Sequence, residues 1–159
     1  MSTNLNDSTP AAPAGGINVK WQTDGSGNDS AYLAAGSNPS LTASVNLLTQ
    51  AANIAATTLL AVTATGLYRV SAYIIRTQVA TTSSTLPSVV ITWTDADNSA
   101  GQTFTLTPTN ATNTLVTPQQ ASMVVDALTA TNIRYATTGY ASVGGTPMQY
   151  ALHLRLEKV

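Results

Sequence analysis

The last twelve residues, MQYALHLRLEKV, alternate between apolar and polar side chains. A period of two is typical of a β-strand that buries one face, because successive side chains point to opposite sides of the strand. We therefore predict a strand whose leucines face the core and whose other face is polar. His153, the single histidine of the chain, falls on the polar face. The positions predicted to be buried are Met148, Tyr150, Leu152, Leu154 and Leu156.

Shorter β patterns, separated by turn-forming residues, precede this strand. They are INVKWQT, LYRVSAYIIRT, SVVITWT, TFTLTP, ASMVVDAL and NIRYATT, with SVVITWT and TFTLTP predicted to form a hairpin around DADNSAGQ. The segment SVNLLTQAANIAATTLLAVTATG has the alanine and leucine content of a helix, but Asn46, Asn53 and the threonines favour two strands joined near Asn53. About eight to ten short strands without an amphipathic helix predict an all-β fold, an antiparallel β-sandwich of jelly-roll type.

The strand LYRVSAYIIRT is apolar on both faces. Val70 and Ile74 share one face, whereas Tyr73 and Ile75 lie on the other. Such a strand lies either in the middle of a sandwich or at a contact between subunits, where tyrosine is common. The candidate oligomer interface therefore consists of Tyr73, Ile75, His153 and Arg155.

The first sixteen residues, MSTNLNDSTPAAPAGG, offer almost no apolar surface to bury. We predict an extended or flexible arm over residues 1–16, which becomes ordered only against a partner, and a single β-sandwich domain over residues 17–159. The arm has neither the basic region nor the apolar region of a signal peptide, so we expect synthesis in the host cytoplasm without export.

Charge is scarce along the chain. Charged residues make up 8% of the sequence, with a net charge of -1, against about 25% in ordinary soluble domains. A surface with so little charge has little electrostatic protection against self-association, so we expect much of it to be covered by other protein. The alternative is a β surface coated with threonine and serine that is soluble by hydration alone. Neither a basic patch for nucleic acid nor an apolar run long enough to span a membrane is present.

His153 is the first candidate for chemistry, and the sequence offers it no partners. Catalysis by a serine or threonine would need a base that a third group orients, and zinc would need further histidine or cysteine ligands. The chain has no cysteine, and its seven acidic residues are dispersed. We therefore expect a surface or interface histidine, no enzyme activity and no cofactor.

Two turns carry oxygen-rich side chains. Asp95, Asp97 and Asn98 in TDADNSAGQ offer oxygens at alternating positions, and DGSGND offers a similar set. Both are partial calcium-loop patterns, but neither has the glycine at the sixth position and the glutamate at the twelfth of an EF-hand loop. Tight turns select the same residue types, so we favour turns over calcium sites.

Two stretches carry a family resemblance. GLYRVSAYI and the Tyr-x-Leu-x-Leu pattern of MQYALHLRLEKV resemble strands of the C1q and tumour-necrosis-factor-like jelly rolls. The stretch from NIRYATT to the C-terminal valine is also similar to the C-terminal part of small β-rich proteins of tailed phages.

This resemblance covers roughly residues 45–159 and has specific implications. It implies a homotrimer and a structural role in a virion, as a capsid-decoration, tail or fibre component. The arm would then bind other virion proteins. The alternative is a lectin-like module that binds carbohydrate or a receptor, for which exposed aromatic residues grouped at one loop end would be the sign.

Overall fold

The computed structural model describes residues 19–23, 29–33, 39–108, 113 and 118–159, and the chain divides into two units, residues 1–38 and 39–159. The first unit contains an antiparallel pair, β1 (Val19–Thr23) and β2 (Asp29–Leu33). The second unit lies within the predicted sandwich domain over 17–159, whose residues 17–38 belong to the first unit. The predicted arm and most of DGSGND lie outside the described residues.

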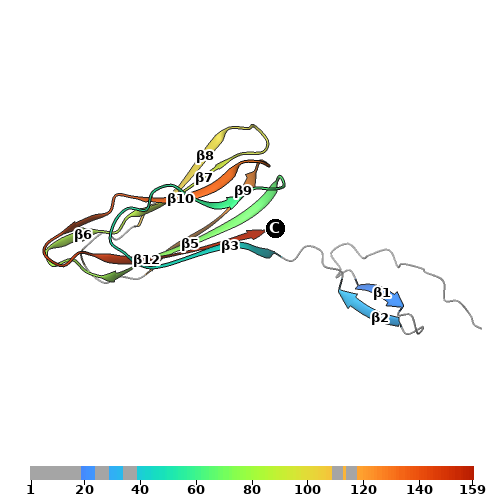
Figure 1. Ribbon diagram of the computed structural model, residues 1–159, viewed down its shortest axis with the longest axis horizontal. Helices are drawn as coiled ribbons and strands as arrows, with labels where there is room; N and C mark the ends of the chain where they lie inside the picture. Colours follow the sequence, from blue (N-terminus) through green and yellow to red (C-terminus); the bar gives the residue numbers. More distant parts are fainter. Residues whose placement is uncertain (1–18, 24–28, 34–38, 109–112, 114–117) are drawn as a thin grey trace, which may run out of the picture. The chain divides into compact units, whose positions relative to one another are not determined.

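The second unit is built from two four-stranded antiparallel sheets (Figure 1). One sheet has the order β3 (Ser40–Gln50), β12 (Gln149–Lys158), β5 (Gly66–Gln78), β9 (Gln119–Ala127). The other has the order β4 (Thr57–Ala61), β10 (Asn132–Thr138), β7 (Ser88–Thr94), β8 (Gly101–Leu106). Two short strands, β6 (Ser83–Thr85) and β11 (Ala141–Val143), pair with each other. The prediction of an all-β antiparallel sandwich is confirmed.

The connections mostly cross from one sheet to the other. Strands β3 and β4, which the ambiguous alanine-rich segment supplies, belong to different sheets, and so do β4 and β5, β8 and β9, and β9 and β10. The predicted hairpin of β7 and β8 is the exception, with Val89 paired to Leu106 and Thr94 to Gly101. The described part of the chain contains no helix, and thus none that is long and apolar enough to cross a membrane.

The core lies between the two sheets. Alternate residues of β12 and β5 point into it, as the period of two predicts. Tyr150, Leu152 and Leu156 of β12 are fully buried, and Ile91 of β7 packs from the facing sheet. The predicted orientation of the C-terminal strand is therefore confirmed, and Trp93 of β7 is half-buried and packs against the core.

Hydrogen bonds join the two sheets at one end of this core. The hydroxyl of Tyr150 on β12 donates to the carbonyl of Ala52 at 2.9 Å and lies 2.9 Å from the hydroxyl of Thr137 on β10. The Thr137 hydroxyl also accepts a hydrogen bond of 2.7 Å from the amide of Ile54. Because Ala52 and Ile54 belong to the connection between β3 and β4, one buried cluster of hydroxyls holds that connection against both sheets.

Arg76, which pairs with Tyr150 across β5 and β12, places a charged side chain at the same end of the core. It lies on the inward side of β5, is 2% exposed, and its Nε donates to Sδ of Met148 at 3.1 Å. Burial lowers the pKa of Arg76, because the charged guanidinium loses hydration. The core is therefore not wholly apolar at this end.

Candidate functional site

The candidate site is the side of the β3-β12-β5-β9 sheet that points away from the core, and we refer to it as the outer face. It carries a groove, an ion pair and exposed apolar side chains. The strand register aligns its side chains in five rows that run across the sheet. In order, the rows contain Ala151 and Ile75; Asn46, His153, Tyr73 and Gln120; Ser44, Arg155, Ser71 and Ser122; Leu41, Glu157, Arg69 and Val124; and Val159, Leu67 and Asp126. Leu48 has the parity of Asn46 on β3 and lies beside the first row, where the register of β3 and β12 shifts.

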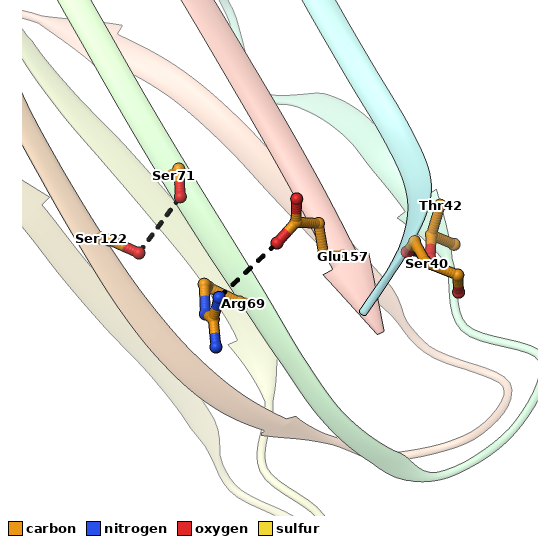
Figure 2. Close-up of polar contacts among 6 residues, drawn as sticks. All are labelled: Ser40, Thr42, Arg69, Ser71, Ser122 and Glu157. Atoms are coloured by element: carbon orange, nitrogen blue, oxygen red, sulfur yellow. Dashed lines mark hydrogen bonds and ion pairs between the residues drawn. The ribbon is translucent and has the colours of Figure 1, made fainter. Parts of the chain in front are cut away.

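A shallow groove of about 520 Å³ crosses the second and third rows. On its floor the rings of Tyr73 and His153 meet edge to face, with their centroids 5.5 Å apart and their planes at 63°. The hydroxyls of Ser71 and Ser122 share a hydrogen bond of 3.1 Å on neighbouring strands β5 and β9 (Figure 2). The groove thus combines one aromatic pair with small polar groups, and Arg155 completes its lining.

The charges of the outer face balance. Arg69 and Glu157 lie opposite each other on β5 and β12 and form an ion pair of 3.7 Å, beside the two serines in Figure 2. Arg155 in the third row and Asp126 in the fifth row add one charge of each sign. With two arginines and two acids, and His153 neutral, the face has a formal charge of zero.

Large apolar side chains concentrate at one end of this face, where four of them lie in the fourth and fifth rows, and Leu48 lies at the other end. Among the described residues, seven large apolar side chains are exposed, and five of them lie here: Leu41, Leu48, Leu67, Val124 and Val159. The other two are Val79, directly after the end of β5, and Val143 on β11. Scattered exposed apolar residues are normal, but a concentration on one face marks an interaction site.

The four residues predicted as an oligomer interface all lie on the outer face. Ile75 is in the first row, His153 and Tyr73 are in the second, and Arg155 is in the third. Sequence reasoning missed the five exposed apolar side chains. Part of the signal was present, since Leu67 has the parity of Tyr73 in the strand LYRVSAYIIRT, and Val124 has the parity opposite to Met123 and Val125.

The environment of His153 is that of a packed surface residue. It lies opposite Asn46 on β3 and Tyr73 on β5, two residues from Arg155 on its own strand. Within the part of the chain that the structure describes, no three His, Cys, Asp or Glu side chains come close enough together to hold a metal ion. The edge-to-face contact of His153 with Tyr73 is packing chemistry of the kind that contacts between proteins use.

The calcium candidates Asp95, Asp97 and Asn98 form the turn between β7 and β8. Oδ1 of Asp95 accepts hydrogen bonds from the backbone amides of Asp97 and Asn98, at 3.1 and 3.3 Å. Oδ1 of Asn98 accepts from the amide of Ala100 at 2.8 Å. Two of the three side chains are thus engaged with the backbone of the turn, as turn residues commonly are.

Comparison of the chain with protein-family models, with curated proteins and with solved structures finds no match.

Proposed function

We propose that this protein is a structural component of a bacteriophage particle and acts through homo-oligomeric assembly. The observation that carries the assembly is the gathering of five exposed apolar side chains on the charge-balanced outer face. A face of this kind is stabilised when it is covered, and a chain with 8% charged residues has little else to keep copies apart. The resemblance to small proteins of tailed phages supports a location in the phage particle. There the protein would be a capsid-decoration, tail or fibre component.

The strand order supports a jelly-roll type of sandwich within this proposal. A jelly roll arranges eight strands in two sheets, with connections that pass from sheet to sheet. The orders β3-β12-β5-β9 and β4-β10-β7-β8, with a single hairpin between β7 and β8, fit that description. The resemblance to C1q-like jelly rolls implies that the protein forms a trimer.

A lectin-like module is the second candidate, and one observation favours it. The groove of the outer face places the Tyr73 ring next to hydroxyl and amide groups of Ser71, Ser122 and Gln120, which is the chemistry that sugars bind. The aromatic residue is partnered by His153 rather than by a second exposed aromatic ring, and no acid lines the groove. Assembly therefore explains more of the face, because it also accounts for the apolar rows.

Multi-angle light scattering of the purified chain over a wide concentration range tests the assembly. We expect a defined oligomer, with three copies as the expected number, and a stable monomer at high concentration would contradict the proposal.

Mass spectrometry of particles purified from a phage whose genome encodes this chain tests the location. Peptides of the chain at a stoichiometry of many copies per particle are expected, and their absence from intact particles would contradict a structural role.

A further inference from the structure

We propose that the outer face of the β3-β12-β5-β9 sheet is the surface that binds a second copy of this chain. This inference rests on the proposed assembly and names the surface through which it occurs. It extends the interface beyond Tyr73, Ile75, His153 and Arg155 to the apolar side chains at both ends of the face.

The size of the face fits a contact between two folded copies. Strands about 4.8 Å apart, with a rise of about 3.3 Å for each residue, give a four-stranded face of roughly 600 Å² when about ten residues of each strand take part. Contact of this face with an equal area on the surface of a second copy would bury about 1,200 Å² in total, at the lower end of stable and specific interfaces. A small ligand in the groove would cover the second and third rows and leave the apolar rows in water.

The chemistry of the face fits a copy of itself better than a charged partner. Its formal charge is zero, so two copies do not repel each other, and a strongly acidic or basic partner gains nothing. The apolar side chains offer surface to bury, with Leu48 on β3 57% exposed and Val124 in the fourth row 53% exposed. Tyr73 and the two arginines belong to the residue types enriched in contacts between proteins.

The test compares two exposed valines of nearly equal exposure. Val124 is 53% exposed on the outer face, and Val143 is 54% exposed on β11, outside it. We expect Val124→Lys to weaken self-association by about tenfold or more, because assembly would bury an unpaired ammonium group, and Val143→Lys to leave it within about twofold. Analytical ultracentrifugation measures both, and circular dichroism verifies that each variant keeps the β fold.

A labelling experiment gives a second readout that does not depend on the lysine variants. Since the chain has no cysteine, Ser122→Cys places a single thiol in the third row of the face, and Ser83→Cys places one at an exposed position of β6 as the control. We expect assembly to slow maleimide labelling at position 122 by about tenfold or more and to leave position 83 unchanged.

The possible results separate the two proposals. If the wild-type chain remains a monomer, the proposed assembly function fails. If it assembles while Val124→Lys associates normally and position 122 labels rapidly, assembly stands, and the outer face is free for another occupant such as carbohydrate, which overturns this inference. Equal weakening by both lysine variants, or protection of position 122 in a dilute monomer, also overturns it, since neither result requires contact of this face with a second copy.

Discussion

The hydroxyl groups of Tyr150 and Thr137 lie 2.9 Å apart at one buried end of the sandwich, where they connect β12 of one sheet to β10 of the other. The Tyr150 hydroxyl donates its proton to the carbonyl of Ala52, so the Thr137 hydroxyl donates to Tyr150 and accepts from the amide of Ile54. Every donor in this cluster has one acceptor. Such a satisfied buried cluster fixes the relative position of the elements that it joins.

Replacing Tyr150 by Phe removes one member of the cluster and keeps the ring in the core. We expect Tyr150→Phe to lower the free energy of unfolding by about 1–3 kcal/mol, because the carbonyl of Ala52 and the hydroxyl of Thr137 each lose a buried partner. Urea denaturation of the wild type and the variant measures the difference. A variant as stable as the wild type would mean that the cluster contributes nothing to the fold.

Tyr150 also gives the fold a dependence on alkaline pH. Burial raises the pKa of Tyr150, an effect that the hydrogen bond from Thr137 offsets in part and the nearby Tyr140 strengthens. In the unfolded chain the same group titrates near its usual value of about 10. The folded state therefore holds the proton more strongly, and the contribution is complete below about pH 10 and is lost as the pH rises through the raised folded pKa.

We expect the unfolding free energy of the wild type to decline above about pH 10 more steeply than that of Tyr150→Phe, which has no proton to lose at this position. Denaturant midpoints measured from pH 8 to 11 test this. The other tyrosines titrate in both proteins, so the comparison isolates Tyr150. Parallel pH profiles of the two proteins would rule out the effect.

Gly144 has a conformation that other residues rarely adopt. Its φ angle is 116°, and a Cβ atom there would lie 2.7 Å from Cβ of Thr81 and 3.0 Å from the amide nitrogen of Thr82. We expect Gly144→Ala to lower stability by about 1–3 kcal/mol, because the strain and the clash act together. Gly145→Ala is the matched control, since a Cβ atom at Gly145 meets no atom within 4 Å. Thermal unfolding of both variants measures the contrast, and equal midpoints would contradict this account of the loop.

Asp95 stabilises the turn between β7 and β8 through two bonds to the backbone. We expect Asp95→Ala to lower the free energy of unfolding by about 1 kcal/mol, and Asp97→Ala, at the exposed neighbouring position, to change it by less than about 0.5 kcal/mol. We also expect millimolar calcium to leave the melting temperature of the wild type unchanged. A rise in the melting temperature with calcium that Asp95→Ala abolishes would instead indicate a calcium site.

Much of the sandwich could be predicted from local patterns. The alternation in MQYALHLRLEKV was enough to orient β12, because its leucines recur at every second residue and its other face is polar. The hairpin of β7 and β8 followed from two β-rich runs on either side of a turn. The outcome of the alanine-rich segment depended on Asn53 and the threonines, and the chain does leave the strand at Gln50 and return to one at Thr57.

The rows of the outer face could not be predicted in the same way. A row joins residues from four strands, so it depends on the register of three pairings, and bulges shift that register where Glu157 pairs with Leu41. A shift of one residue would exchange the two faces of a strand. The alternation within each strand was therefore enough to assign Tyr73 and His153 to a face of their own strands. It could not align Leu41 and Val124 with the Arg69–Glu157 pair, because that alignment depends on the register between strands.

Strand β12 lies between β3 and β5, although the ribosome makes it long after both. Until Gln149–Lys158 is available, β3 lacks its neighbour in the sheet and β5 lacks one of its two. Between the completion of β5 and the synthesis of β12, the nascent chain therefore holds two strands without their shared neighbour, a state in which chains aggregate or recruit chaperones. The sandwich is complete only once β12 has been made, and we expect nascent chains stalled before β12 to be bound by chaperones far more than chains that contain it.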